Sequence, residues 1–118
     1  MKRPPDLPTV RAMCWAVVAV IRARRELRRQ GLEAVAVASP PALPPHAVRG
    51  VGFVLRARPS TCLERALVLQ AWHAAHGSPR AIVIGVAGSS RAFRAHAWLE
   101  GELPGTADYE ELVRLPPR

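Results

Sequence analysis

Residues 61–67, which read TCLERAL, mark the start of a helix and determine how the second half of the chain folds. Thr61 and Glu64 form a capping-box pattern: the threonine side chain accepts the amide of residue 64, and the glutamate reaches back to the amide of residue 61. Gly77 ends the same helix about four turns later, because glycine fits the position after a helix C-terminus. The pattern therefore places Cys62 at the first position of the helix.

The chain changes to a β pattern after this helix. Residues 81–87 (AIVIGVA) form a short apolar run rich in branched side chains, which indicates a buried strand, and a turn signal follows at residues 88–90. Residues 91–100 then read as a second strand, so we expect an antiparallel hairpin. Alternation along the second strand puts Phe93, Ala95, Ala97 and Leu99 on one face and Arg94, His96, Trp98 and Glu100 on the other.

The first half of the chain is helical by its pattern. A helix is predicted from about Thr9 to Gln30, with Thr9 as its N-cap, and a proline-rich connector follows over residues 39–45. A further helix is predicted from Pro45 to about Ala57. Helices followed by strands predict an α+β fold. We expect a single compact domain overall, in which residues 1–45 form the N-terminal helix and connector and residues 46–118 form the main core.

Composition excludes several classes of protein. The chain has 118 residues, 17 basic and 9 acidic, and a net charge of +8. Two cysteines, Cys14 and Cys62, exclude a disulfide scaffold and suggest free thiols in the cytoplasm. The apolar run 12–21 is too short to span a bilayer, and the arginines after it stand where a signal peptide needs small residues. The basic cluster at residues 22–29 is either a solvated face or a docking surface for an acidic peptide or partner protein.

Cys62 is the candidate nucleophile. The thiolate is the reactive form of cysteine, and the partial positive charge and unpaired amides at a helix N-terminus favour it. The same amides can stabilise an oxyanion that forms beside the sulfur. The alternative is a small buried apolar cysteine, which is the commoner role of this residue type and the one expected for Cys14.

A cysteine nucleophile needs a base and a group that orients that base. His73 and His76 lie near the far end of the Cys62 helix, about 15 Å or more from the thiol at 1.5 Å per residue. His46, in the connector, is expected to be exposed. His96 therefore is the candidate base, flanked by small residues that favour close packing of its strand against a helix.

The carboxylates after His96 supply candidates for the orienting group. Asp108, beyond a turn, is preferred because the chain can return beside His96 on a neighbouring strand, and Glu102 is the reserve. His73 and His76 have a spacing that would permit a shared metal, but no further ligand group accompanies them, so no metal site is predicted.

Three motifs occur in order: residues 61–67 (TCLERAL), residues 84–86 (IGV) and residues 95–100 (AHAWLE). Over about residues 50–118 this combination resembles the transglutaminase-like leader peptidases of lasso peptide biosynthesis, whose pattern is a CL-x-R-A-L helix start, an IGV strand and an AHAW-x-E strand. The resemblance implies a papain-like Cys–His–Asp cysteine peptidase. Its catalytic residues would be Cys62 as nucleophile, His96 as base and Asp108 as third member, although the family often has Gly-Asp or Asn-Asp where this chain has Ala107-Asp108.

The resemblance also implies a pathway. A peptidase of this kind removes the leader from a ribosomally made precursor peptide, a separate leader-recognition protein presents that leader, and the freed core passes to an ATP-dependent lasso cyclase. The chain length fits the stand-alone form, because a fused recognition domain needs roughly another 80 residues. The peptidase chemistry itself implies no cofactor and no metal.

Two other functions remain open at this point. A transglutaminase-like enzyme would use the same residues for amide exchange in place of hydrolysis. A basic nucleic-acid-binding module would use the arginine cluster for phosphate contacts. The second alternative is weaker, because the sequence has no recognisable nucleic-acid-binding motif and few aromatic residues to stack on bases.

Overall fold

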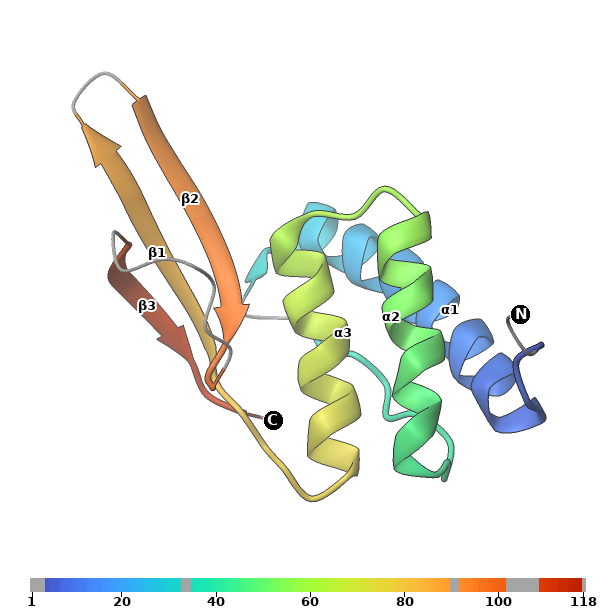
Figure 1. Cartoon of the computed structure of the whole chain (residues 1–118). Coiled ribbons are helices and arrows are strands. Elements are labelled where there is room, and N and C mark those ends of the chain that lie inside the picture. Colours follow the sequence, from blue (N-terminus) through green and yellow to red (C-terminus); the bar gives the residue numbers. More distant parts are fainter. Residues whose placement is uncertain (1–3, 33–34, 90–91, 102–108, 118) are drawn as a thin grey trace.

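The computed structural model describes residues 4–32, 35–89, 92–101 and 109–117. These residues form α1 (Leu7–Gln30), a short 3-10 helix η2 (Pro45–Ala47), α2 (Val48–Ala57) and α3 (Cys62–Ala75), followed by β1 (Ile82–Ser89), β2 (Ala92–Leu99) and β3 (Glu110–Leu115). Figure 1 shows the helices side by side, with α3 next to the sheet. The predicted α+β fold is confirmed. None of the described helices is long and apolar enough to cross a membrane.

The start of α1 differs from the prediction. The N-cap is Asp6, not Thr9, and the Thr9 amide donates to Asp6 Oδ1 at 3.0 Å. Pro8 therefore lies inside the first turn, where its missing N–H has no intrahelical acceptor to lose. The other end is as predicted, because Gly31 follows Gln30 with φ of 80°.

The buried face of α1 consists of small residues: Ala12, Ala16, Ala19, Val20 and Ala23. Cys14 is exposed, so the prediction that it packs in the core is wrong. The reason is helical periodicity, since two residues after Ala12 the helix has turned by about 200° and points to the opposite side.

The core has two parts. The first lies between the helices and contains Val51, Val68 and Trp72, while the second lies between α3 and the sheet and contains Leu67, Ile82 and Leu99. The close approach of α1 and α2 depends on Gly50, because a Cβ there would collide with the Thr9 carbonyl oxygen.

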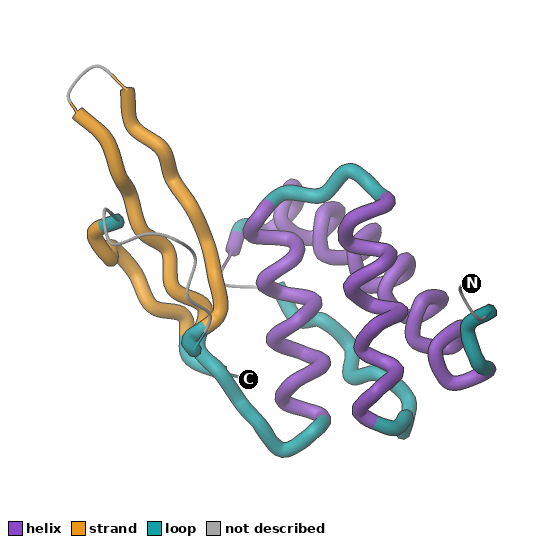
Figure 2. Tube along the Cα trace, in the orientation of Figure 1, coloured by secondary structure: helices purple, strands orange, loops and turns teal. Residues whose placement is uncertain are grey.

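The sheet has the order β2-β1-β3, and both pairs are antiparallel. The predicted hairpin is thus confirmed, and His96 on β2 lies opposite Gly85 on β1. The pairing of β1 with β3 shifts register between Ile84 and Gly85, so Leu112 is an extra residue on β3. Figure 2 shows β2 as the strand nearest the helices and β3 on the far side of β1.

Candidate active site

Cys62 is the first residue of α3, as predicted, and its half-buried side chain lies at the end of the helix that meets β2. Both hydrogen bonds of the capping box are present: Glu64 N–H donates to Thr61 Oγ1 at 3.1 Å, and Thr61 N–H donates to Glu64 Oε1 at 3.0 Å. The amide of Arg65 begins the regular helix by donating to the Thr61 carbonyl. The N–H of Cys62 has no acceptor among the described residues, so it is available to a bound group.

The thiol lies against the edge of the sheet. Cys62 Sγ accepts a hydrogen bond from the Ala97 N–H, with a nitrogen to sulfur distance of 3.4 Å. Successive amides of a strand point to opposite sides, so this N–H points away from β1, toward the helix. The sulfur therefore sits beside the backbone of the residue that directly follows His96.

His96 emerges on the opposite face of β2 from Ala97, because consecutive side chains alternate. Ala97 and Leu99 are buried toward α3, whereas His96 and Trp98 are half-exposed, so the predicted division of faces is confirmed for these positions. No hydrogen bond joins the Cys62 thiol to the imidazole within the described part of the chain. Such bonds are often long before substrate binds, so the geometry without substrate does not exclude this pair.

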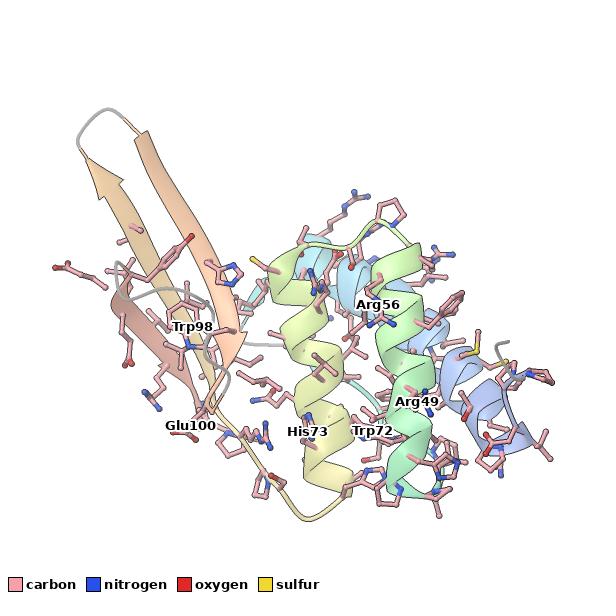
Figure 3. The ribbon with its side chains drawn as sticks, viewed as in Figure 1. Arg49, Arg56, Trp72, His73, Trp98 and Glu100 are labelled. Atoms are coloured by element: carbon pink, nitrogen blue, oxygen red, sulfur yellow. The ribbon has the colours of Figure 1, made fainter. Side chains whose placement is uncertain are left out.

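An aromatic cluster surrounds the imidazole. The ring centroids of His96 and Trp98 are 5.7 Å apart with an interplanar angle of 23°, and those of His96 and Tyr109 are 5.6 Å apart. Trp98 and Tyr109 also contact each other, edge to face, at 5.9 Å. Figure 3 shows Trp98 over the strands, on the side away from α3. These contacts limit the orientations that the imidazole can adopt.

Gly85 makes room for this cluster. A Cβ at this position would lie 2.8 Å from Trp98 Cη2 and 2.8 Å from the Glu110 carbonyl oxygen. Because Gly85 is directly opposite His96, its missing side chain lets the Trp98 indole approach β1 and lets the β3 backbone come close.

Glu64 ties the Cys62 end of α3 to α1. Its side chain is buried and forms a two-point ion pair with Arg24, with Nε to Oε2 and Nη2 to Oε1 distances of 3.0 Å. Arg24 Nη2 also donates to the Pro59 carbonyl at 2.6 Å. The hydrogen bond from Arg24 lowers the pKa of the Glu64 carboxyl, against the opposing effect of burial. Arg24 thus balances a negative charge that would otherwise oppose a thiolate two residues away.

The other histidines serve structural contacts. His46 is exposed, as predicted, and its Nε2 lies 2.7 Å from Asp6 Oδ2. Hydrogen bonds from Thr9 and His46 lower the pKa of Asp6 to about 2. His76, at the end of α3, stacks on Trp72 and has both ring nitrogens against backbone carbonyls.

Two candidate orienting groups, Asp108 and Glu102, lie outside the described residues. A third carboxylate, Glu100, follows β2 and pairs with Arg114 of β3 at 2.6 Å. Sequence reasoning missed the roles of Gly85 and Tyr109. The signal for Gly85 was present, because a glycine inside an apolar strand indicates a close backbone approach.

A cysteine at a helix N-terminus, set against the backbone of a strand that carries a histidine, is a layout suited to cysteine-dependent acyl transfer. The comparison with protein families agrees: the chain matches the Transglutaminase-like superfamily over residues 9–114 and belongs to that family. Members of this superfamily are generally enzymes, either cysteine proteases or acyltransferases. The match begins within α1, so it extends further than the motifs at residues 61–100. Comparisons with curated proteins and with solved structures give no significant match.

Proposed function

We propose that this protein is a cysteine peptidase that removes the leader from a ribosomally made lasso precursor peptide. The proposal extends the coarser conclusion that a transglutaminase-like fold supports cysteine peptidase or acyl-transfer activity. The main supporting observation is the hydrogen bond of Cys62 Sγ to the Ala97 amide, which brings a helix-terminal thiol next to the backbone of His96. The motifs of the lasso leader peptidases supply the choice of substrate.

In the proposed mechanism Cys62 Sγ attacks the carbonyl carbon of the scissile amide. The Cys62 N–H, which has no acceptor among the described residues, binds the oxyanion of the tetrahedral intermediate. His96 takes the thiol proton and delivers it to the leaving amine, which leaves an acyl thioester on Cys62. His96 then removes a proton from water, and the resulting attack releases the carboxylate and restores the thiol.

Asp108 is proposed to orient the His96 imidazole. It lies outside the described residues, but its neighbour in sequence, Tyr109, contacts the His96 ring. That contact supports Asp108 over Glu102, which is seven residues from Tyr109. A carboxylate in this role fixes the tautomer and stabilises the imidazolium that forms during the reaction.

The proposed reaction takes place in the cytoplasm with two partner proteins. A leader-recognition protein presents the precursor, and a lasso cyclase receives the freed core peptide. Reduced thiols are the normal state in that compartment, which suits a cysteine nucleophile. The proposed steps need no metal or cofactor.

Mass spectrometry of a reaction mixture tests this function. The protein is incubated with a lasso precursor peptide and its leader-binding protein, and we expect leader and core fragments whose summed mass exceeds that of the precursor by one water. The His96→Ala variant is expected to produce about 10² to 10⁴-fold less product, the usual range for loss of a general base. A precursor that stays intact in the presence of both proteins contradicts the proposal.

Amide exchange is the second candidate, because the family includes acyltransferases. The same thioester would then react with an amine in place of water. Adding an ordinary primary amine such as methylamine at millimolar concentration distinguishes the two: a hydrolase still releases mainly free carboxylate, whereas an exchange enzyme releases mainly the amine conjugate. Predominant conjugate would replace the peptidase assignment with the second candidate.

A further inference from the structure

The exposed face of α1 carries a continuous stripe of apolar and basic side chains, which we call the α1 stripe. Its members are Leu7, Val10, Arg11, Cys14, Val18, Ile21, Arg22, Arg25, Arg28 and Arg29, all of them exposed. Their spacing of three and four residues keeps them within about a third of the helix circumference. The stripe is opposite the alanine-rich face that packs on α2 and α3.

The apolar part of the α1 stripe is larger than ordinary surface positions explain. Leu7 is 72% exposed, Val18 48% and Ile21 42%, and with Val10 they account for four of the seven exposed large apolar side chains among the described residues. Single exposed apolar residues are normal, but a contiguous row along one helix marks an interaction surface.

The charged part of the α1 stripe lies mainly at one end. Arg22, Arg25 and Arg29 follow Ile21 within the last turns, and none of them has an ion-pair partner in the described part of the chain. No acidic residue belongs to the stripe. The nearest, Glu26, is half-buried beside residues 36–38, where it lines a cavity whose rim includes the stripe residues Val18 and Arg22.

We infer that the α1 stripe is the docking surface for an amphipathic, acidic helix of a partner protein. The partner helix would cover Val18 and Ile21 with its own apolar side chains. Its carboxylates, gathered toward one end, would pair with Arg22 and Arg25. The apolar contacts along the two helices would bury hydrophobic surface and so contribute to affinity. The unpaired arginines would favour a negatively charged partner and determine the direction in which the partner helix lies.

The charge pattern favours this occupant over a second copy of the chain. Parallel pairing of two α1 helices would put arginines against arginines. Antiparallel pairing would put them near Leu7 and Val10, where the adjacent carboxylate, Asp6, already pairs with His46 and the Thr9 amide. A membrane surface also fits poorly. Membrane-bound amphipathic helices carry basic residues along the whole polar face and large aromatic anchors, whereas this stripe is aliphatic and most of its arginines lie at one end.

A designed peptide tests the docking surface in isolation from any catalytic activity. The probe is a fluorescently labelled helical peptide with leucines at heptad spacing and glutamates at one end, and its twin has lysines in place of the glutamates. We expect fluorescence anisotropy to show binding of the glutamate peptide, weaker at high salt, and at least tenfold weaker binding of the lysine peptide. Equal binding of the two peptides, or no binding of either, overturns the inference.

Matched variants locate the binding on the protein. Val18→Ser/Ile21→Ser and, separately, Arg22→Glu/Arg25→Glu are each expected to raise the dissociation constant about tenfold or more. Two control variants are expected to change the dissociation constant less than twofold. The first, Arg49→Glu/Arg56→Glu, replaces the exposed arginines of α2 that Figure 3 labels, and the second, Phe53→Ser, replaces the exposed Phe53. The first control matches the charge change of the arginine variant. All substituted side chains are exposed, and thermal unfolding checks that each variant folds.

The same variants decide between occupants. Sedimentation velocity of the protein alone reports self-association, and co-sedimentation with vesicles of anionic phospholipid reports membrane binding. Duplex DNA retardation reports phosphate binding. If the stripe substitutions abolish self-association, vesicle binding or DNA binding while leaving the peptide affinity unchanged, the acidic-helix assignment is wrong.

Discussion

Replacing Cys62 with alanine is expected to lower the rate of precursor cleavage by at least about 10³-fold, while Cys14→Ala leaves the rate within twofold. Cys62 occupies the helix N-terminus beside the strand that carries His96, whereas Cys14 is exposed on α1. Cys14 is the only other thiol in the chain, and it lies on the exposed face of α1. Initial rates from mass spectrometry, with thermal unfolding to confirm that each variant folds, provide the measurement.

Cys62→Ser is the closest control for this prediction. The hydroxyl keeps the size and polarity of the side chain and a hydrogen bond from the Ala97 N–H remains possible, but the oxygen is a far weaker nucleophile at neutral pH. We expect it to be as inactive as Cys62→Ala and as stable as the parent protein. Cleavage that persists in both variants at more than a tenth of the parent rate would falsify the assignment of Cys62.

Replacing Glu64 with alanine is expected to lower the free energy of unfolding by about 1.5–3 kcal/mol, since the Arg24 side chain that loses its partner is about a third exposed and can be hydrated. The substitution removes a buried carboxylate, leaves Arg24 without its partner and breaks the capping box at the start of α3. Urea denaturation measures the change. The exposed pair of Glu111 and Arg114 provides the control, since Glu111→Ala removes only a surface ion pair and is expected to lower the stability far less than Glu64→Ala does.

The contribution of Glu64 also has a defined pH dependence. The Arg24 hydrogen bond lowers the pKa of this carboxyl in the folded state below the unfolded value of about 4.3. The stabilisation is therefore fully present above the unfolded pKa and is lost as pH falls through the folded pKa. The stability difference between the parent and Glu64→Gln is expected to narrow below about pH 4. A difference that stays constant down to pH 2 contradicts the role of this pair.

Local sequence signals predicted the elements around the candidate site. The capping box at Thr61 and Glu64 depends on residues three apart, so its geometry follows from the sequence alone and the structure confirms it. The alternation along β2 likewise placed Ala97 and Leu99 toward the core and His96 away from it. Helix ends at glycine were predictable for the same reason, because the conformation after Gln30 is a local property.

Long-range contacts were not predictable from the pattern. The pair of Arg24 with Glu64 joins residues 40 positions apart, and nothing in the arginine cluster distinguishes Arg24 from its neighbours. The exposure of Cys14 depends on which face of α1 packs against α2. The start of α1 shifted to Asp6 because a proline in the first turn is compatible with a helix.

The roles of Trp98 and Tyr109 beside the imidazole depend on how three strands meet. Sequence alternation put Trp98 on the same face as His96, but its contact follows from the space that Gly85 leaves on β1. Tyr109 reaches the same ring because β3 pairs with β1 and its register shifts near Gly85. Strand order and bulges are set by tertiary packing, so a single sequence does not reveal them.

Covalent trapping tests the proposed nucleophile most directly. A leader peptide that ends in a chloromethyl ketone in place of the scissile amide alkylates the attacking sulfur with loss of chloride, and peptide mapping identifies the modified residue. We predict a single thioether on Cys62, formed much more slowly in His96→Ala, with Cys14 unmodified. Modification of Cys14 in preference to Cys62, or no modification of a protein that cleaves the precursor, would contradict Cys62 as the nucleophile.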